Sequence, residues 1–409
     1  MQAETFASLG LSPFFLSSLK ERNILSPTEI QKKVIPRLLA GESFIFSSAT
    51  GTGKTFAYLL PFLESIFGLL SEESTGMALR GKPLLLIAAP TIELCSQIKN
   101  EVDFLLKAAP FPIRSVLLIG SAAPGRQIEA LKRDRPGVIV GNPGRILALA
   151  RQRKLKLNDI RFLVLDEGDR LVQDELFGET GEMVSLLKSP YVGTACSATI
   201  PAKSRARLLP LLGTPASLAA AKETVDLTLN VLREKMEHWA FFCPEREKAE
   251  LLRSLLAALA SGKKGASLKA LVFLSRAGRV EETASRLQHH KIAALALSGA
   301  MDSKHRREAL DAFRSGRIRV LVSSDLAARG LDISGVTHVI ALDVNEDRDV
   351  YLHRAGRTAR AGKTGVMISI GTEGEMRRLA ALEKSLGIKV YPKALYGGRI
   401  LAPESDVGG

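Results

Sequence analysis

Short apolar runs alternate along the chain with stretches that have helical spacing. In the first half these runs carry little polar alternation, which is typical of strands buried on both faces of a parallel sheet. The strands predicted there are residues 44–47, 84–89, 116–119, 138–140 and 162–165. Between them, residues 93–107 and 127–133 have the apolar spacing of amphipathic helices.

The second half repeats this pattern, with a change of character between the halves. The strands predicted there are residues 270–274, 292–297, 318–322, 338–342 and 366–370, and the helices are 279–290 and 304–314. Two α/β units in series are the simplest interpretation. Polar residues collect and the strand pattern lapses at 225–235, which predicts a linker between domains 1–224 and 236–390. Residues 71–83 are predicted to form a surface loop, and 391–409 a short, weakly structured tail.

Length and composition fit two globular domains. The chain has 409 residues, 46% of them apolar and 24% charged, which argues against a disordered protein. It contains no run of about 18 apolar residues, so no transmembrane helix is expected. The N-terminus does not resemble a signal peptide. The three cysteines lie far apart without a CxxC pair, which disfavours a disulfide framework or a zinc site and predicts a cytoplasmic protein.

The net charge predicts a polyanionic partner without identifying it. There are 57 Lys and Arg against 43 Asp and Glu, a formal net charge of +14. Residues 1–224 carry 27 basic and 21 acidic side chains, a net of +6; residues 225–409 carry 30 and 22, a net of +8. Because both halves are basic, a polyanion could contact both.

A glycine-bearing loop follows the first predicted strand. Residues 47–55 read Ser-Ser-Ala-Thr-Gly-Thr-Gly-Lys-Thr and precede the helical stretch 56–67. Backbone N–H groups in such a loop, together with the helix N-terminus, favour an anion. Lys54 can reach the β- and γ-phosphates of a nucleotide, and the Thr55 hydroxyl can bind Mg²⁺. Ser48 stands where the strict phosphate-loop pattern has its first glycine, but the placement between strand and helix argues against a chance turn.

An acidic cluster ends the strand predicted at 162–165. It reads Asp166-Glu167-Gly168-Asp169, and the carboxyl edge of a doubly wound sheet is where such folds bind ligands. One carboxylate can hold Mg²⁺ and a second can position or deprotonate water. Acidic turns are common, so the cluster is strong evidence for a ligand site only in combination with the phosphate loop upstream. Together they indicate hydrolysis of a nucleoside triphosphate.

With these two motifs the chain resembles the DEAD-box ATP-dependent RNA helicases, over roughly residues 6–370. The resemblance implies two RecA-like parallel-sheet domains in tandem, with ATP and RNA sites at the interdomain cleft. It implies ATP and Mg²⁺ as cofactors and RNA as the partner. In this family Asp166 would hold the metal and Glu167 would activate the attacking water.

Further motifs extend the expected ATP site. Residues 23–31 resemble the Q motif, residues 323–333 motif V, and residues 351–360 motif VI, H-R-x-G-R-x-x-R. Arg357 and Arg360 are three residues apart and share one helical face, as arginine fingers would. The expected nucleotide-binding residues are Phe6, Gln31, Thr50, Gly51, Thr52, Gly53, Lys54, Thr55 and Asp332. The expected catalytic residues are Lys54, Asp166, Glu167, Arg357 and Arg360, with Thr55 and Asp166 as metal ligands.

The resemblance also assigns an RNA surface and a coupling group. RNA phosphates would be held by Thr91, Gly120, Gly144, Arg145, Ser275, Arg306, Ser324 and Gly330. Nucleotide state would be coupled to domain closure through Asp169, Ser197, Thr199 and His353. The chain departs from the family at Ile92 for Arg, Ser121 for Gly, Asn142 for Thr and Ser303 for Gln, which predicts weaker RNA contact. Gly168 replaces Ala, and Asn23-Ile24 replaces Gly-Phe.

Three functions remain open from the sequence. The first is an RNA-dependent ATPase that unwinds short duplexes without processivity or remodels RNA–protein complexes, which the completeness of the motifs favours. The second is an ATP-gated RNA clamp or scaffold, suggested by the altered RNA-facing residues. The third is a DNA-directed helicase. Gln31 and the acidic motif argue against this third function. A monomer is expected, and the natural RNA target cannot be inferred from the sequence.

Overall fold

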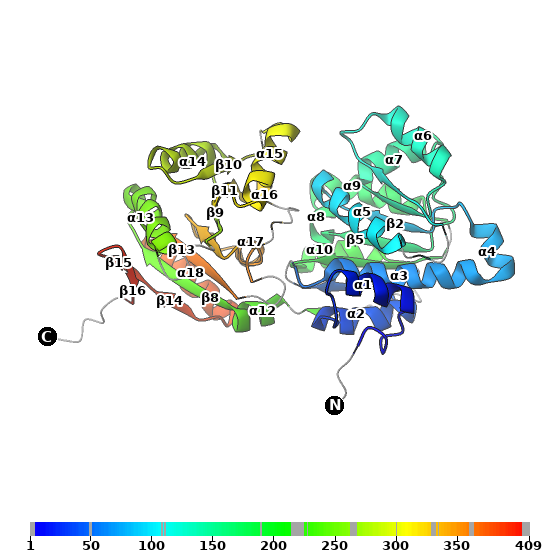
Figure 1. Ribbon diagram of the computed structural model, residues 1–409, viewed down its shortest axis with the longest axis horizontal. Coiled ribbons are helices and arrows are strands. Elements are labelled where there is room, and N and C mark those ends of the chain that lie inside the picture. Colours follow the sequence, from blue (N-terminus) through cyan, green and yellow to red (C-terminus); the bar gives the residue numbers. More distant parts are fainter. Residues whose placement is uncertain are drawn as a thin grey trace. The chain divides into compact units, whose positions relative to one another are not determined.

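The apolar runs form two parallel sheets in the computed structural model (Figure 1). The structure describes residues 5–48, 51–107, 109, 112–188, 190–213, 225–226, 228–261, 268–299, 301–328, 333, 335–359 and 364–402. Apart from residues 49–51, the chain divides into two compact units, residues 1–48 with 52–227 and residues 228–409. Each unit has its own sheet and its own apolar cores, so the predicted fold class of two α/β domains in tandem is confirmed.

In the first domain the parallel strands follow the order β3-β4-β2-β5-β6-β1-β7. The strands are β1 (Phe44–Ser47), β2 (Leu85–Ala88), β3 (Ser115–Leu118), β4 (Val138–Gly141), β5 (Phe162–Asp166), β6 (Val192–Ser197) and β7 (Val225–Asp226). The helices are α1 (Pro13–Glu21), α2 (Glu29–Leu39), α3 (Lys54–Ser71), α4 (Glu73–Leu79), α5 (Ile92–Leu106), α6 (Pro124–Asp134), α7 (Pro143–Arg151), α8 (Gly168–Leu171), α9 (Asp174–Ser185), α10 (Ala202–Leu208) and the 3₁₀ turn η1 (Leu209–Leu211). Helices α1, α2, α3 and α5 bury apolar side chains in one core, and α7, α9 and α10 in another.

In the second domain the parallel order is β10-β11-β9-β12-β13-β8-β14, and a separate hairpin pairs β15 with β16. The strands are β8 (Met236–Phe242), β9 (Ala270–Leu274), β10 (Ala294–Leu297), β11 (Val320–Ser324), β12 (His338–Ala341), β13 (Gly365–Gly371), β14 (Val390–Pro392), β15 (Ala394–Tyr396) and β16 (Arg399–Leu401). The helices are α12 (Thr228–Lys235), α13 (Lys248–Ser261), α14 (Val280–His289), α15 (Ser303–Arg314), α16 (Asp325–Ala328), α17 (Arg348–Ala355) and α18 (Glu373–Leu386), with 3₁₀ turns η2 (Glu245–Glu247) and η4 (Ala277–Arg279). Two apolar cores again flank the sheet.

The predicted strands are all present to within two residues at their ends, but three local predictions need correction. The surface loop predicted at 71–83 contains helix α4. The tail predicted to be weakly structured forms β14, β15 and β16 up to residue 401. The predicted linker 225–235 contains β7 and α12, while the domain limits stay predictions. No described helix is long and apolar enough to cross a membrane.

A buried ion pair joins two helices of the second domain. Lys248 Nζ at the start of α13 donates to Glu375 Oε2 in α18 at 2.7 Å and to the Leu342 carbonyl after β12 at 2.9 Å. Glu375 is 8% exposed and also accepts from the Thr372 and Val344 backbone N–H groups. Burial raises the pKa of Glu375, but these hydrogen bonds and the Lys248 charge outweigh it and hold the pKa below its usual value.

We expect Glu375→Gln to destabilise the second domain by about 2 kcal/mol, since the buried charged hydrogen bond is lost while Lys248 keeps its ion pair with Glu245 at 2.8 Å. The chain's single tryptophan, Trp239, lies in β8, so its fluorescence during urea unfolding reports this domain. Because the pKa of Glu375 is lowered in the fold, its contribution is complete above the unfolded pKa and lost as pH falls through the folded pKa. The difference between wild type and variant should therefore shrink in acid.

The matched control is Glu373→Gln in the same helical turn. Glu373 pairs with Arg377 on the surface, with the two side chains 74% and 79% exposed, so its replacement should cost about 0.5 kcal/mol or less. Equal destabilisation by the two variants would contradict a specific role for the buried pair.

Candidate active site

The phosphate loop connects β1 to α3 in the first domain. Gly51 and Gly53 have positive φ angles of 78° and 95°, and α3 begins at Lys54. A Cβ atom at Gly53 would lie 2.4 Å from the side-chain nitrogen of Gln31, so any other residue there would displace Gln31 and strain the backbone. The Lys54 ammonium donates to the Ser48 carbonyl at 2.5 Å, which keeps it at the loop. Thr50 lies outside the described residues.

Gln31 connects the Q motif to the phosphate loop. Its side chain is 2% exposed, and Oε1 accepts from the Thr28 N–H at 2.9 Å as part of the capping box of α2. Its Nε2 donates to the Gly53 carbonyl at 3.1 Å. The structure thus brings Gln31 to the loop, while its contact with adenine stays a prediction. Phe6 is 3% exposed and packs in an apolar core, and its adenine contact likewise stays a prediction.

The acidic cluster lies where β5 ends. Asp166 is 4% exposed, and its Oδ1 accepts from the Glu167 N–H at 2.8 Å. Glu167 has φ of 49°, a left-handed conformation that is uncommon outside glycine. Such backbone strain collects at functional sites, where the surrounding structure must hold it in place. The conformation therefore supports a special role for the Glu167 side chain.

Tyr58 is a site residue that the sequence analysis missed. It is fully buried in α3, and its hydroxyl donates to Asp166 Oδ2 at 2.8 Å. Burial, and then the charge of Asp166, raise the pKa of Tyr58 well above its usual value, so the hydroxyl keeps its proton. This hydroxyl therefore orients Asp166, one of the two predicted metal ligands. The spacing of three residues from Thr55, which puts Tyr58 on the same helical face, is the signal that could have identified it.

Behind the acidic cluster, Asp169 and Ser197 meet inside the domain. The Ser197 hydroxyl donates to Asp169 Oδ1, and both residues are buried, as is Thr199. The structure thus joins the acidic motif to the end of β6, and their coupling role stays a prediction. Packing explains Gly168: a Cβ there would lie 3.2–3.3 Å from Leu208 and Ala195, closer than an ordinary contact.

The RNA-facing residues of the first domain follow β2 and β4. The Thr91 hydroxyl caps α5 by accepting from the Leu94 N–H, and Ile92 beside it is 37% exposed. Arg145 Nη2 donates to the Gly120 carbonyl at 2.9 Å, so the structure brings these two predicted RNA contacts together. Gly144 precedes Arg145 in the first turn of α7.

The side chain of Asn142, where the family has Thr, ties its loop to the neighbouring strand. Asn142 Nδ2 donates to the Ala89 carbonyl at 2.9 Å, just beyond the end of β2. The amide therefore has a structural contact of its own, whatever it contributes to RNA.

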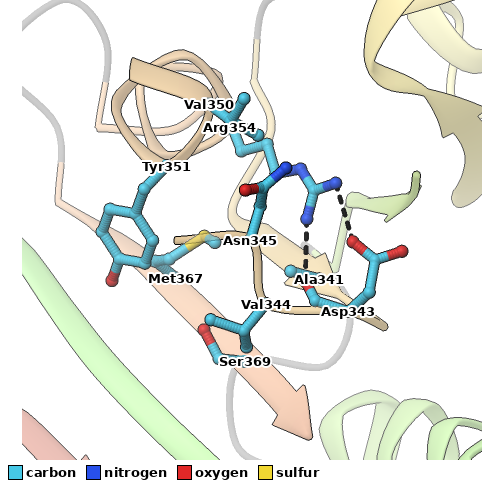
Figure 2. Close-up of a pocket in the computed structure, with 9 residues that line it drawn as sticks. All are labelled: Ala341, Asp343, Val344, Asn345, Val350, Tyr351, Arg354, Met367 and Ser369. Atoms are coloured by element: carbon cyan, nitrogen blue, oxygen red, sulfur yellow. Dashed lines mark hydrogen bonds and ion pairs between the residues drawn. The ribbon is translucent and has the colours of Figure 1, made fainter. Parts of the chain in front are cut away.

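Arg354 is the centre of the second domain's motifs, and the sequence analysis did not assign it. Its side chain is 3% exposed and donates to both oxygens of Asp325 at 2.7 Å. It also donates to Ser275 Oγ at 3.0 Å, to Asp343 Oδ1 at 2.8 Å and to the Asp343 carbonyl at 2.9 Å. Figure 2 shows the guanidinium turned toward Asp343 beside a small cavity that Tyr351 also lines. Arg354 of motif VI thus links Ser275 to Asp325 of motif V.

Ser275, a predicted RNA contact, is fixed by the same network. Its N–H and hydroxyl both donate to the Asp343 carboxylate, each at 2.6 Å. Burial opposes the charge on Asp343, but Arg354 and these two hydrogen bonds hold the pKa of Asp343 below its usual value. The carboxylate is therefore ionised at neutral pH and orients the serine.

The remaining predicted residues of this domain are partly outside the described chain. Arg306 Nη2 donates to the Ala327 carbonyl at 2.7 Å, and the buried Ser324 hydroxyl accepts from the Ala327 N–H at 3.4 Å, so these two lie together. Arg357 is 4% exposed and His353 is half-buried. Gly330, Asp332, Arg360 and the side chain of Ser303 lie outside the described residues.

Two family models match the chain. The DEAD/DEAH box helicase model matches residues 28–208, and the helicase conserved C-terminal domain model matches residues 247–362. Together they cover both domains and nearly all the motifs described above.

Among curated relatives, the DEAD-box ATP-dependent RNA helicase CshC of Bacillus cereus is 34% identical over 390 residues, 95% of this chain and 93% of the relative. The probable ATP-dependent RNA helicase YfmL of Bacillus subtilis is 32% identical over 374 residues, 91% of this chain and 92% of the relative. Similarity at this level extends along almost the whole of each chain.

Solved structures with the same fold include S. cerevisiae Dbp5 bound to RNA and ADP BeF3, with TM-score 0.79 and 27% identity, covering 95% of this chain and 96% of that one. Mss116p bound to ssRNA and AMP-PNP has TM-score 0.80 at 22% identity, covers 96% of this chain and 80% of that one, and bears on the fold alone. Both domains of this chain therefore have the RecA-like fold of these helicases. On its motifs, its two family models and relatives matched along almost their whole length, the chain belongs to the DEAD-box ATP-dependent RNA helicases.

Proposed function

We propose that this protein is a cytoplasmic, monomeric RNA-stimulated ATPase that separates short RNA duplexes locally or remodels RNA–protein complexes. The observation that carries the proposal is the buried hydrogen bond between Tyr58 and Asp166 beside the phosphate loop, with the half-buried Thr55 on the same helix. It holds a carboxylate and a hydroxyl ready in a site where Lys54 supplies positive charge. All three cysteines are free and buried, which supports a reducing compartment.

Within this proposal each residue of the first domain has a defined task. Lys54 and the N–H groups at the start of α3 bind the phosphates, and Gln31 orients the adenine. Glu167, next to Asp166 but with its own left-handed backbone, positions and deprotonates the attacking water. Arg357 and Arg360 of the second domain would stabilise charge on the transferred phosphoryl group once the domains close, as arginine fingers do.

Thr55 and Asp166 fit Mg²⁺. Both offer oxygen ligands, which this cation prefers, and Mg²⁺ is commonly held by one or two protein groups together with substrate phosphates. No group of three or more His, Cys, Asp or Glu that could enclose a metal occurs among the described residues. When bound, the metal neutralises charge on the β- and γ-phosphates. Tyr58 orients Asp166 before nucleotide arrives.

RNA would be held by its backbone with slight sequence specificity. The predicted contacts lie at helix N-termini and loop hydroxyls, such as Thr91 at the start of α5, which suit phosphates and not base edges. The favoured alternative is an ATP-gated clamp with little unwinding. It is supported by Ile92, an exposed apolar side chain where the family carries a cation.

We expect Glu167→Gln to reduce RNA-stimulated ATP hydrolysis about 100-fold or more, because the amide cannot accept a proton from water. ATP binding should persist, since the amide keeps the size of the side chain. Phosphate release with and without RNA, and binding of a fluorescent ATP analogue, measure the two effects. The exposed Glu175→Gln in the same domain is the matched control and should change neither.

A strand-displacement assay with a short RNA duplex separates the candidate functions. ATP-dependent displacement that Glu167→Gln abolishes supports the helicase. Hydrolysis without displacement would favour the clamp. Stronger stimulation of hydrolysis by single-stranded DNA than by RNA would overturn the choice of substrate.

We expect Tyr58→Phe to weaken the apparent Mg²⁺ affinity about 10-fold, as loss of a group that orients metal ligands commonly does. The measurement is nucleotide affinity across a Mg²⁺ series, where the variant should need more metal but bind nucleotide alike in its absence. Tyr351→Phe removes another buried hydroxyl, hydrogen-bonded to His238 in the second domain, and is the matched control. An unchanged Mg²⁺ dependence in Tyr58→Phe would remove this role from the hydroxyl.

We expect Ile92→Arg to strengthen RNA binding and to steepen its salt dependence. A new phosphate contact changes the slope of log affinity against log salt by about 0.7 for a single strand. Fluorescence anisotropy of a labelled single-stranded RNA over a salt series gives both quantities. Met77→Arg places the same charge at a 79% exposed position on α4 and should leave the slope nearly unchanged. Equal effects of the two variants would show only a general charge effect.

A further inference from the structure

The C-terminal strands form a surface that none of the helicase motifs uses. Strand β14 lies at one edge of the second sheet, and the strands β9, β11 and β10, which lead into the RNA-facing motifs, lie toward the other edge. Figure 1 shows β14, β15 and β16 (red) beside β8 and α13. These strands follow the end of the helicase C-terminal match at residue 362. Any site here is therefore separate from the motif residues of the same domain.

Aromatic and basic side chains line β14 and its neighbour β8. Tyr391 is the register partner of Trp239, so the two side chains point to the same face of the sheet. Lys389 and Lys393, two residues to either side of Tyr391, share that face. Lys389 Nζ lies 5.2 Å from the centre of the Tyr391 ring, and Lys393 Nζ lies 5.6 Å from the centre of the Trp239 ring. We call these four residues the β14 strip.

The hairpin of β15 and β16 adds a second aromatic and basic pair. Leu395 and Ile400 pack against the same core cluster as Trp239, which fixes the hairpin to the domain. Tyr396 and Arg399 are register partners at the hairpin's turn and point away from that core, and Tyr396 is 80% exposed. Gly397 and Gly398 make the tight turn with positive φ angles of 55° and 73°.

The charge of this surface is positive. Among the described residues, Lys389, Lys393 and Arg399 outnumber the two carboxylates that accept hydrogen bonds from β8 and β14: Glu237 from Trp239 Nε1 at 3.0 Å and Glu383 from the Val390 N–H at 2.8 Å. Lysines alone would suit the ordinary protection of an exposed edge strand. That need does not account for Tyr391, 42% exposed, or for Tyr396, because exposed aromatics do not discourage edge pairing.

We propose that the β14 strip and the hairpin pair Tyr396–Arg399 form a second binding site for single-stranded RNA. Bases of any sequence can stack on Tyr391 and Tyr396, since every base has a π-face, and the three cations pair with phosphates. The site extends the proposed function, because it takes the same RNA as the motif residues. It holds a strand independently of nucleotide and keeps the helicase on RNA between cycles of hydrolysis.

Trp239 gives a direct measurement of this site in the full-length protein without ATP. It is the only tryptophan, so RNA bound at the strip should change its fluorescence. Titration with a 20-nucleotide single-stranded RNA should produce this change in the wild type. In Lys389→Ala/Lys393→Ala the change should require about fivefold more RNA or higher. Because no hydrolysis is measured, the result stands whether or not the protein is an RNA-stimulated ATPase.

Affinity measurements test both halves of the surface. We expect Tyr396→Ala/Arg399→Ala and Lys389→Ala/Lys393→Ala each to weaken binding of the 20-nucleotide RNA about fivefold or more, and Lys389→Ala/Lys393→Ala to reduce the salt slope by about 1.4. Binding of a six-nucleotide RNA in the presence of a non-hydrolysable ATP analogue, which reports the motif site, should stay unchanged.

The matched control is Arg377→Ala/Lys384→Ala, which removes two exposed cations from α18 in the same domain. A fivefold loss there as well would overturn the proposal, since the effect would then be net charge. Unchanged RNA affinity in both surface variants would also overturn it and leave the exposed aromatics to a protein partner. Urea unfolding of each variant, followed by circular dichroism, shows that the domain is still folded.

Discussion

The parallel pairing of β6 between β1 and β5 is the constraint on which the ATP site depends. Cys196 in β6 is the register partner of Phe46 in β1 and of Asp166 in β5, so all three strands end at the same edge. The phosphate loop follows β1, the acidic cluster lies at the end of β5, and the coupling residues Ser197 and Thr199 lie at the end of β6 and just beyond it. Residues more than a hundred positions apart are therefore brought together by backbone hydrogen bonds alone, and the side chains need only short local contacts to complete the site.

Each domain then fixes its functional carboxylates with a buried donor. In the first domain Tyr58 donates to Asp166, and in the second Arg354 donates to Asp325 and Asp343. A buried carboxylate without such a donor would be costly, and a donor without its carboxylate equally so. Each network thus holds its motifs in one arrangement, because the buried donor and the buried carboxylates each require their partner. The buried hydrogen bonds that stabilise each domain therefore also position its site residues before any ligand binds.

The strands that could be predicted from the sequence are those made of uninterrupted apolar residues, because a strand buried on both faces of a sheet needs apolar side chains at every position. That pattern does not identify β6, whose Gly193, Thr194 and Ser197 are small or polar, or β8, where Glu237 and His238 break the run. In both strands tertiary contacts supply what propensity does not: Thr194 donates to the Phe44 carbonyl, and His238 hydrogen-bonds Tyr351. Such partners are distant in sequence and leave no local pattern.

For the site, the sequence located residues whose chemistry and spacing are distinctive, such as Lys54 and the acidic motif. It did not find Arg354 or Asp343, since an arginine beside another motif residue, or an aspartate outside the motifs, has no signal of its own. It also missed Tyr58, whose only signal is its spacing from Thr55. Their roles depend on what surrounds them in three dimensions. Gly168 is similar: an alanine side chain there would lie 3.2 Å from Leu208, forty residues away in sequence, and the leucine would have to shift to admit it.

The positive side chains are also distributed differently from what the net charge of +14 suggests. Several arginines are committed to carboxylates, such as Arg22 with Glu101 and Arg151 with Glu182, and contribute little potential at a distance. At the start of α5, where the family carries a cation, this chain has Ile92. Lys389, Lys393 and Arg399 instead put three cations beside exposed tyrosines on the C-terminal strands. From this distribution of charge we expect weaker RNA binding by the motif residues of the first domain and compensating RNA binding on the second domain. Binding that retains the RNA would then be separate from the site that acts on it.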